Sequence, residues 1–372
     1  MEDDGTNLMI LDYLGNGYTY TIAGHTLTAI TDADFPAATK SLTYQDGYFI
    51  VNKQDTGRFY ISALKDPTSW DALDYATAEA YSDQLMVVIS TGRELWLLGR
   101  DSYEIWYNSG ASDFPFARMS GGVFKGGCGA RYSVVAYGNR IFMRGTDGSI
   151  KMSEGYQFKT ISTPQVNFSL PAMDQSLAGG IYSAFCYSQE GHDFYVLNSY
   201  STTAGTSSTW VYDITTGLWH ERRSGSTNIK WRGNCGLYYP HSEKIIVGDP
   251  ASGVLYALNL GTYTDYAAAG NVAITRVRAA QAVYGDRKNI FHAALEIEFE
   301  AGGSADILCQ WSDDGGSTYN TGITKSTGAT RTTRIIWRRL GRSRDRIYKL
   351  TTTTAAKFVL IGAWLDAEVG AA

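Results

Sequence analysis

Residues 81–119 read YSDQLMVVISTGRELWLLGRDSYEIWYNSGASDFPFARM, and the spacing of glycine-containing turns between the apolar runs of this stretch decides the fold. Its three apolar or aromatic-rich runs, separated by glycine-containing turns, are Leu85–Ile89, Leu95–Leu98 and Ser102–Tyr107. Short runs between such turns predict three antiparallel strands joined as a meander. We expect Trp96 and Trp106 to lie in the core of this unit. Exposure of both on one rim would instead mark a contact between subunits.

Similar units of strand, turn and strand recur along the chain, with starts near residues 42, 81, 133, 182 and 235. A spacing of about 40 to 55 residues is typical of propeller blades, each a small antiparallel sheet. No WD or kelch signature accompanies the repeat, and a large β-sandwich is the alternative fold. Trp70–Tyr81 (WDALDYATAEAY) is the one stretch with helical character.

Composition favours the same fold class. The 372 residues include 40 glycines and 26 tyrosines but only 7 prolines, which suits many short strands joined by glycine turns. A net charge of −5 gives no reason to expect general binding of polyanions. The four cysteines lie far apart and only 5 histidines are present, so we expect free thiols and no metal site. A disulfide between distant cysteines is the alternative.

The pattern changes near residue 265 to cleanly alternating strands. In Ala294–Glu300 (ALEIEFE), every second residue is apolar and the others are mostly charged. We therefore predict an all-β chain with two domains. A β-propeller-like body of short antiparallel blades occupies residues 1–266, and a C-terminal antiparallel β-sandwich occupies residues 267–372.

One short motif resembles the Asp-box, S-x-D-x-G-x-T-W, with Tyr319 in place of tryptophan. An aspartate that accepts backbone N–H groups across a glycine turn is a folding device. The predicted structural turn consists of Ser312, Asp314, Gly316 and Thr318. The alternative that it suggests is a carbohydrate-binding or glycan-cleaving propeller for receptor recognition. Because no HExxH, GxSxG, P-loop or GxGxxG pattern is present, we predict no enzyme, no catalytic residue and no cofactor.

Residues 331–349 (RTTRIIWRRLGRSRDRIYK) form the most basic stretch of the chain. Alternation around Ile335 and Trp337 should place many of its cations on one solvated face of a sheet. They could bind an acidic protein or nucleic acid phosphate. The alternative, which we favour, is a charged edge that prevents pairing with other strands. The residues of this candidate patch are Arg331, Arg334, Arg338, Arg339, Arg342, Arg344, Arg346 and Lys349.

Several stretches taken together resemble one family, the tail-hub or packaged-DNA stabilisation proteins of short-tailed bacteriophages. They include RFYISAL at 58–64, LWLLGRDSYEIW at 95–106, FPF at 114–116 and IVGD at 246–249. The segment from WSDDGG at 311–316 to WRRLG at 337–341 resembles a β module common in phage tail proteins. Family members usually carry further strands before the position that matches Leu8. The resemblance therefore leaves open whether the propeller is smaller, closes differently or is truncated at its start.

The resemblance implies a structural virion protein, made in the host cytoplasm and located in the phage tail. It implies a ring, in our expectation a hexamer, below the portal and its adaptor protein. The ring would hold packaged double-stranded DNA in its lumen and carry distal tail proteins. The family has no catalytic residues to transfer. Residues 1–7 are acidic and polar, and no apolar run approaches about 20 residues, so neither a signal peptide nor membrane anchoring is expected.

Overall fold

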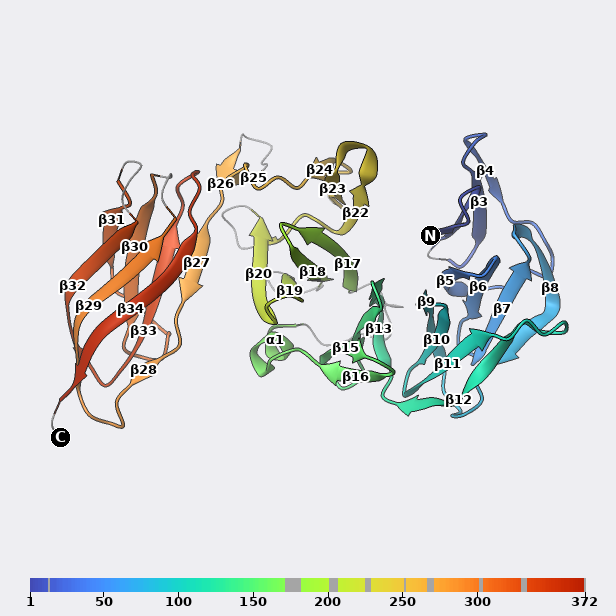
Figure 1. Ribbon diagram of the computed structural model, residues 1–372, viewed down its shortest axis with the longest axis horizontal. Coiled ribbons are helices and arrows are strands. Elements are labelled where there is room, and N and C mark those ends of the chain that lie inside the picture. The colour runs from blue at the N-terminus through green and yellow to red at the C-terminus, as the bar shows by residue number, and fades with distance from the viewer. Residues whose placement is uncertain are drawn as a thin grey trace. The chain divides into compact units, whose positions relative to one another are not determined.

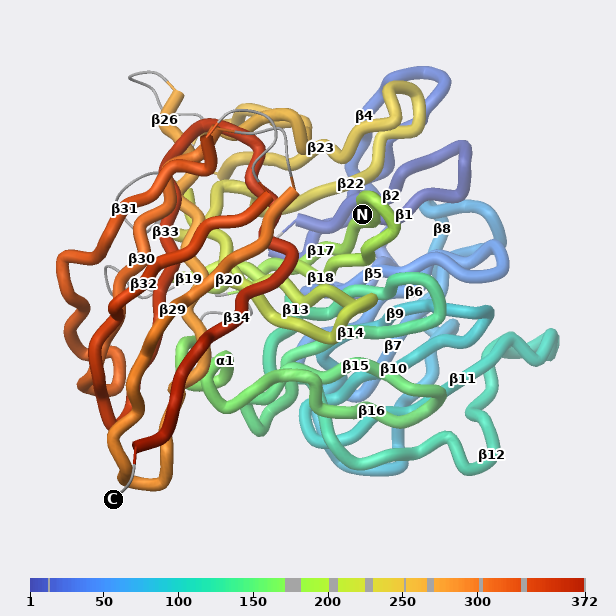
Figure 2. The backbone as a smooth tube through the Cα atoms, turned by 60° about the vertical axis from the view of Figure 1, so that its left-hand side comes forward, coloured from blue at the N-terminus to red at the C-terminus, as the bar shows by residue number. Residues whose placement is uncertain are grey.

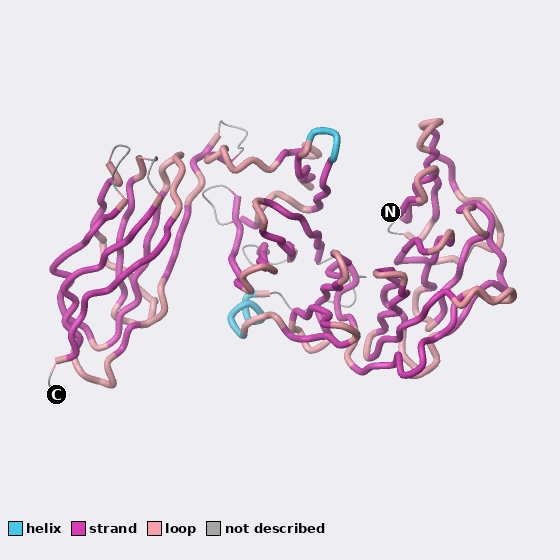
Figure 3. The backbone as a smooth tube through the Cα atoms, viewed as in Figure 1, coloured by secondary structure: helices cyan, strands magenta, loops and turns pink. Residues whose placement is uncertain are grey.

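The computed structural model describes residues 1–12, 14–170, 182–200, 207–224, 229–250, 252–265, 271–300, 304–328 and 333–370. Most of these residues are in β-strands, as Figure 3 shows, which confirms the predicted fold class. The chain forms two compact units. The first comprises Met1–Arg223 and Lys230–Ala257, and the second comprises Ser224–Ile229 and Leu258–Ala372.

The first unit contains six small antiparallel sheets in the described part of the chain, and these follow one another in sequence (Figures 1 and 2). The first sheet contains β1 (Glu2–Asp3), β2 (Asn7–Leu11), β3 (Gly17–Thr21) and β4 (Thr26–Ala29). The second contains β5 (Thr39–Gln45), β6 (Tyr48–Lys53), β7 (Arg58–Ala63) and β8 (Asp66–Thr77). The third contains β9 (Leu85–Thr91), β10 (Glu94–Gly99), β11 (Ser102–Asn108) and β12 (Phe116–Lys125).

The fourth sheet contains β13 (Cys128–Tyr137), β14 (Arg140–Gly145), β15 (Ile150–Glu154) and β16 (Gln157–Thr160). The fifth contains β17 (Tyr182–Gln189), β18 (His192–Ser199), β19 (Ser208–Asp213), β20 (Leu218–Ser224) and β21 (Ile229–Lys230). The sixth contains β22 (Cys235–Tyr239), β23 (Lys244–Gly248) and β24 (Leu255–Ala257). The helices of the described residues are short, namely α1 (Pro164–Ser169) and the 3-10 helix η2 (Pro240–Ser242).

The third sheet is the meander predicted for residues 81–119, with β12 as a fourth strand. Leu95 and Leu97 pack in a cluster with residues of the second sheet, and Trp96 packs in another with residues of the fourth. Both faces of the sheet are therefore covered, which explains why β10 is apolar without alternation. Trp96 is 2% exposed and Trp106 is 9% exposed, so both belong to the core as predicted.

The prediction of a helix at 70–81 is wrong, because most of this stretch belongs to β8. Trp70 is buried and its indole Nε1 donates to the carbonyl of Pro67 at 2.8 Å. Tyr75 lies opposite Tyr60 of β7, and their rings are 5.3 Å apart. Cross-strand aromatic packing outweighs the helical preference of the alanines in this segment.

Side-chain hydrogen bonds join the innermost strands of neighbouring sheets. Ser41 of β5 donates to the carbonyl of Val88 in β9 at 3.0 Å and accepts from its amide at 2.9 Å. Arg131 of β13 donates from Nε to the carbonyl of Met86 at 2.9 Å. Ser183 of β17 donates to the carbonyl of Asn234 at 2.9 Å. These bonds stabilise contacts between sheets that share no backbone ladder.

The second unit contains an antiparallel sandwich and a two-stranded ribbon of β25 (Thr264–Asp265) and β26 (Val272–Ala273). One sheet of the sandwich has the strand order β27-β33-β30-β31, with β28 also paired to β33, and the other has the order β32-β29-β34. Its strands are β27 (Arg276–Ala279), β28 (Val283–Tyr284), β29 (Ile290–Phe299), β30 (Asp306–Ser312), β31 (Ile323–Ser326), β32 (Arg334–Ser343), β33 (Asp345–Thr352) and β34 (Leu360–Val369). Leu295, Ile297 and Phe299 are buried between the sheets, as the alternation of β29 predicts.

Candidate functional site

The first unit contains an axial pocket, which we define as the cavity of about 610 Å³ lined by the innermost part of all six sheets. Its lining includes Glu2, Ser41, Val88, Arg131, Tyr182 and Cys235. None of these residues belongs to a predicted motif. Most of them could have been predicted from the sequence, because they lie in the first strand of each repeat unit.

Arg131 is the buried cation of the axial pocket. The residue is 7% exposed, and its Nη1 has no hydrogen-bond partner among the described residues. Burial lowers the pKa of Arg131, and burial also raises the pKa of Glu2 in the same pocket. A guanidinium and a carboxyl group can hold polar groups, and the described residues of this lining include no histidine that could act as a base toward its serines or Cys235.

The described residues contain no cluster of histidine, cysteine and acidic side chains that could hold a metal ion. All four cysteines are free thiols. Burial raises the pKa of Cys128 and of Cys309 to about 12, so both stay protonated at neutral pH. A buried neutral thiol packs like a small apolar side chain and is a poor nucleophile.

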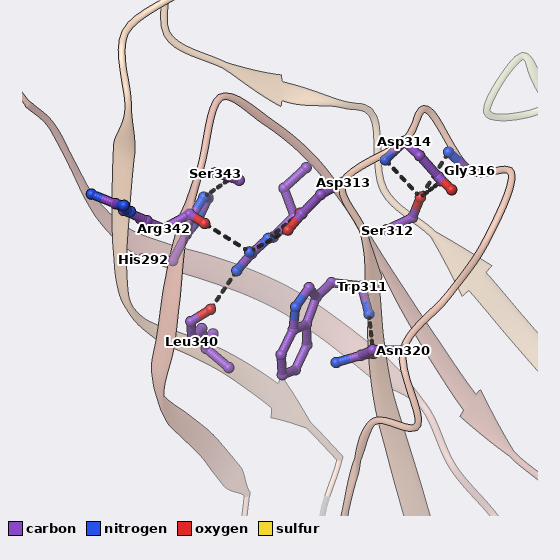
Figure 4. Close-up of polar contacts among 11 residues, drawn as sticks. His292, Trp311, Ser312, Asp313, Asp314, Gly316, Asn320, Leu340, Arg342 and Ser343 are labelled. Atoms are coloured by element: carbon purple, nitrogen blue, oxygen red, sulfur yellow. Dashed lines mark hydrogen bonds and ion pairs between the residues drawn. The ribbon is translucent and has the colours of Figure 1, made fainter. Parts of the chain in front are cut away.

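The Asp-box-like residues form a closed turn after β30 (Figure 4). Ser312 donates from Oγ to Asp314 at 2.6 Å and accepts from the amide of Gly316 at 2.8 Å. Asp314 accepts from the amide and the hydroxyl of Thr318, at 2.9 and 2.6 Å. Hydrogen bonds from Ser312 and Thr318 lower the pKa of Asp314 to about 2. The polar atoms of this turn are thus engaged within it.

Asp313, which lies between Ser312 and Asp314, forms an ion pair with a residue outside the turn. Arg346 is buried, with its side chain 3% exposed, and forms a two-point ion pair with Asp313 through Nε at 2.7 Å and Nη2 at 2.8 Å. The guanidinium also donates to the carbonyl oxygens of Leu340 and Arg342 (Figure 4). Arg346 therefore joins the turn after β30 to the β32–β33 hairpin.

The structure does not bring all of the predicted patch together. Arg331 lies outside the described residues, and Arg346 is interior. Lys349 is half-buried, and its Nζ lies 3.7 Å from the ring centroid of Tyr319, the residue that replaces the Asp-box tryptophan. The exposed members are Arg334, Arg338, Arg339, Arg342 and Arg344, which lie along β32 and in the turn that follows it.

The exposed face of β32 is adjacent to acidic strands. Arg334 forms an ion pair with Glu296 of β29 at 3.2 Å. In the register of the sheet, Ala294 lies between Arg338 and Asp366, and Phe291 lies between Arg342 and Glu368. The face is therefore striped with both signs of charge. A rigid polyanion laid across it would meet carboxylates as well as guanidinium groups.

Two family models match the chain. The model of the bacteriophage P22 Gp10 β-propeller matches residues 1–263, and that of the bacteriophage P22 Gp10 β-sandwich matches residues 275–368. No curated protein matches the sequence. None of the helices in the described residues is long and apolar enough to cross a membrane.

Solved structures resemble the chain at low identity. For the dihydro-heme d1 dehydrogenase NirN in complex with DHE, the TM-score is 0.44 at 13% identity, over 71% of this chain and 56% of that one. For BamB from Moraxella catarrhalis, the TM-score is 0.40 at 14% identity, over 70% of this chain and 69% of that one. The chain thus spans little more than half of the dehydrogenase.

Proposed function

Because the chain belongs to the bacteriophage P22 Gp10 family, and so is a structural protein of a phage tail, we propose that it is the hub or nozzle of that tail. In this role its copies form a ring, in our proposal a hexamer, below the portal and its adaptor protein. The ring helps to retain packaged DNA and carries the distal tail proteins. The observation that carries this proposal is a pair of family matches, propeller then sandwich, that together span almost the whole chain.

We propose that the protein acts mechanically and is not an enzyme. The support comes from the groups that most resemble a glycosidase motif. Asp314 is engaged by Ser312 and Thr318, and Asp313 is engaged by Arg346. Both carboxylates are thus accounted for as parts of the fold, so the Asp-box-like turn gives no support to a glycosidase.

Charge distribution supports a ring with DNA in its lumen. We take the domains to be residues 1–266 and 267–372, although the limit between them falls within 266–270, outside the described residues. The first holds 27 acidic and 18 basic residues, and the second holds 10 acidic and 14 basic residues. An acidic body would keep phosphates from adhering to the wall. Domains of opposite net charge also suit head-to-tail contacts between neighbouring copies, which close into a ring by rotation.

We propose that the exposed arginines of β32 dock localised carboxylates of a neighbouring tail protein and not DNA, because a continuous phosphate backbone would also meet the carboxylates of β29 and β34. Charge reversal of Arg338, Arg339 and Arg342 should then weaken attachment of a neighbouring tail protein while virions keep their DNA. Loss of DNA from otherwise complete tails would favour the DNA-contact interpretation instead.

Electron microscopy of intact particles tests the hub role most directly. We expect density for this chain in a ring around the tail axis below the portal, with rotational symmetry. Particles assembled without the chain should lose DNA after packaging. The proposal fails if the chain does not surround the axis. It also fails if purified protein stays monomeric both alone and with the portal–adaptor complex.

A further inference from the structure

The two lateral sides of the C-terminal sandwich differ. On the side where β31 meets β32, Trp337 donates from Nε1 to the carbonyl of Ile323 at 3.0 Å, and Lys325 donates from Nζ to that of Ile336 at 2.8 Å. On the side between β27 and β34, no hydrogen bond joins the two strands among the described residues. A groove of about 810 Å³ separates them instead. The sandwich is thus closed on one side and open on the other.

The floor of this groove is the core of the sandwich. Leu295 and Ile307, which are at most 5% exposed, line it together with Leu350 and Leu365. Thr352 also lines the groove, and its buried hydroxyl has no hydrogen-bond partner among the described residues. An apolar floor of this kind favours an occupant that covers it, because removing apolar surface from water is favourable.

The rims of the groove are two unpaired strand edges of different character. The first six residues of β34, Leu360–Leu365 (LIGAWL), contain no charge and no proline, and Ile361 is 64% exposed. A long apolar edge without such protection readily pairs with another strand. The opposite rim, β27, carries Arg276 and Arg278.

Charge indicates what the occupant carries. Arg276 donates from Nη1 to the carbonyl of Ala356 at 2.9 Å. Among the described residues, Arg278 is exposed and has no partner, and none of those that line the groove carries a carboxylate. The described lining therefore offers one free cation on an apolar background, which suits a segment with an acidic side chain among apolar ones.

We propose that this groove accepts an extended strand from a protein partner. The strand adds to the edge of β34, buries alternate apolar side chains over Leu295 and Ile307, and places a carboxylate against Arg278. Main-chain hydrogen bonds supply affinity in this mode, and the alternate side chains supply specificity. The inference does not depend on the hub role, because it concerns the sandwich by itself.

The test uses the full chain and a short synthetic peptide in which valine alternates with threonine or glutamate. Fluorescence anisotropy should show binding, weakened at least about tenfold when lysine replaces glutamate, which corresponds to about 1.4 kcal/mol. Arg278→Glu should reverse that preference for charge. Ile361→Lys should abolish binding, whereas Val369→Lys, at the far end of the same strand and outside both Leu360–Leu365 and the groove, should leave it unchanged. Hydrogen exchange should slow in β34 when the peptide is bound.

Several outcomes would overturn the proposal. They are no binding at millimolar peptide, equal binding of both peptides, or protection confined to other strands. Self-association of the free chain that Ile361→Lys abolishes would assign the groove to a second copy instead. Circular dichroism of each variant separates loss of binding from loss of the fold. Because this test needs no virion, its failure would leave the hub role untouched.

Discussion

The ion pair between Asp313 and Arg346 gives the sharpest prediction, because its two members differ in exposure. The Arg346 side chain is 3% exposed, whereas that of Asp313 is 45% exposed. Asp313→Ala therefore leaves a buried cation without its counter-ion. Breaking a buried pair in this way costs about 3–5 kcal/mol, and we expect about 3 kcal/mol because two carbonyl acceptors remain.

Arg346→Met leaves a carboxylate that water can reach, so its main cost is the buried carbonyl of Leu340 left without a donor, about 1–3 kcal/mol at most; the contact with the carbonyl of Arg342 is long, at 3.4 Å, and only partly buried. The double variant should be more stable than Asp313→Ala alone, because it no longer contains the unpaired buried charge. In a sandwich of this size, about 3 kcal/mol lowers the Tm by roughly 12 °C or more.

Scanning calorimetry of the full chain measures this effect, and the transition of the propeller serves as an internal reference. Asp345→Ala is the matched control, since this exposed acid lies beside Arg346 in β33 and should change stability by less than about 0.5 kcal/mol. The reasoning is refuted if Asp313→Ala costs under about 1 kcal/mol, or if the double variant equals the sum of the two single variants.

Three further predictions concern single residues. Gly127→Ala should lower the free energy of unfolding of the propeller by about 2–3 kcal/mol, measured as a markedly lower urea midpoint. The reason is that a Cβ there would meet the backbone of Arg100, which cannot move aside. Ser41→Ala should cost about 1–3 kcal/mol in the same assay, because it removes both hydrogen bonds to Val88. The pKa of Asp314, held near 2, predicts a pH effect: its stabilisation is complete above its ordinary pKa of 3.8 and is lost as pH falls through about 2. The difference in sandwich stability between the wild type and Asp314→Asn should therefore shrink between pH 4 and pH 2, as thermal melts would measure.

Controls keep these three tests specific. Gly24→Ala should be tolerated, because its Cβ would make only ordinary van der Waals contacts. An unchanged urea midpoint for Gly127→Ala or for Ser41→Ala would contradict the packing described here. A pH-independent difference for Asp314→Asn would show that its hydrogen bonds do not depend on the charge.

The local sequence pattern was enough to predict the strands of the blades. It was not enough to predict the strand at Trp70–Tyr81 or the burial of Arg346. The run Leu95–Leu98 predicts a buried strand whichever neighbours cover it, and both of its faces are covered. Trp70–Tyr81 has alanines at helical spacing, but its state depends on the partner strand β7. Such cross-strand pairing is not encoded within the segment.

Arg346 shows the same limit for the candidate site. In sequence it resembles its basic neighbours, yet its burial depends on Asp313, 33 positions away. One of its acceptors, the carbonyl of Leu340, follows a β-bulge in β32, where Arg339 adopts a φ of 60° and the alternation of the strand shifts. A bulge of one residue reverses which side chains face inward, and the sequence alone gives no sign of it.

The axial pocket has a consequence for the order in which the chain folds. Met1 and Glu2 line it together with Cys235 and Pro250, so its wall joins residues made earlier to residues made more than 200 positions later. The earlier sheets can form from sequential hairpins while synthesis continues. The wall stays incomplete until the sixth sheet has left the ribosome, and contacts of such long sequence separation form slowly. We therefore expect a nascent chain stalled before residue 235 to expose the innermost strands, and completion of the pocket wall to be the last and slowest step.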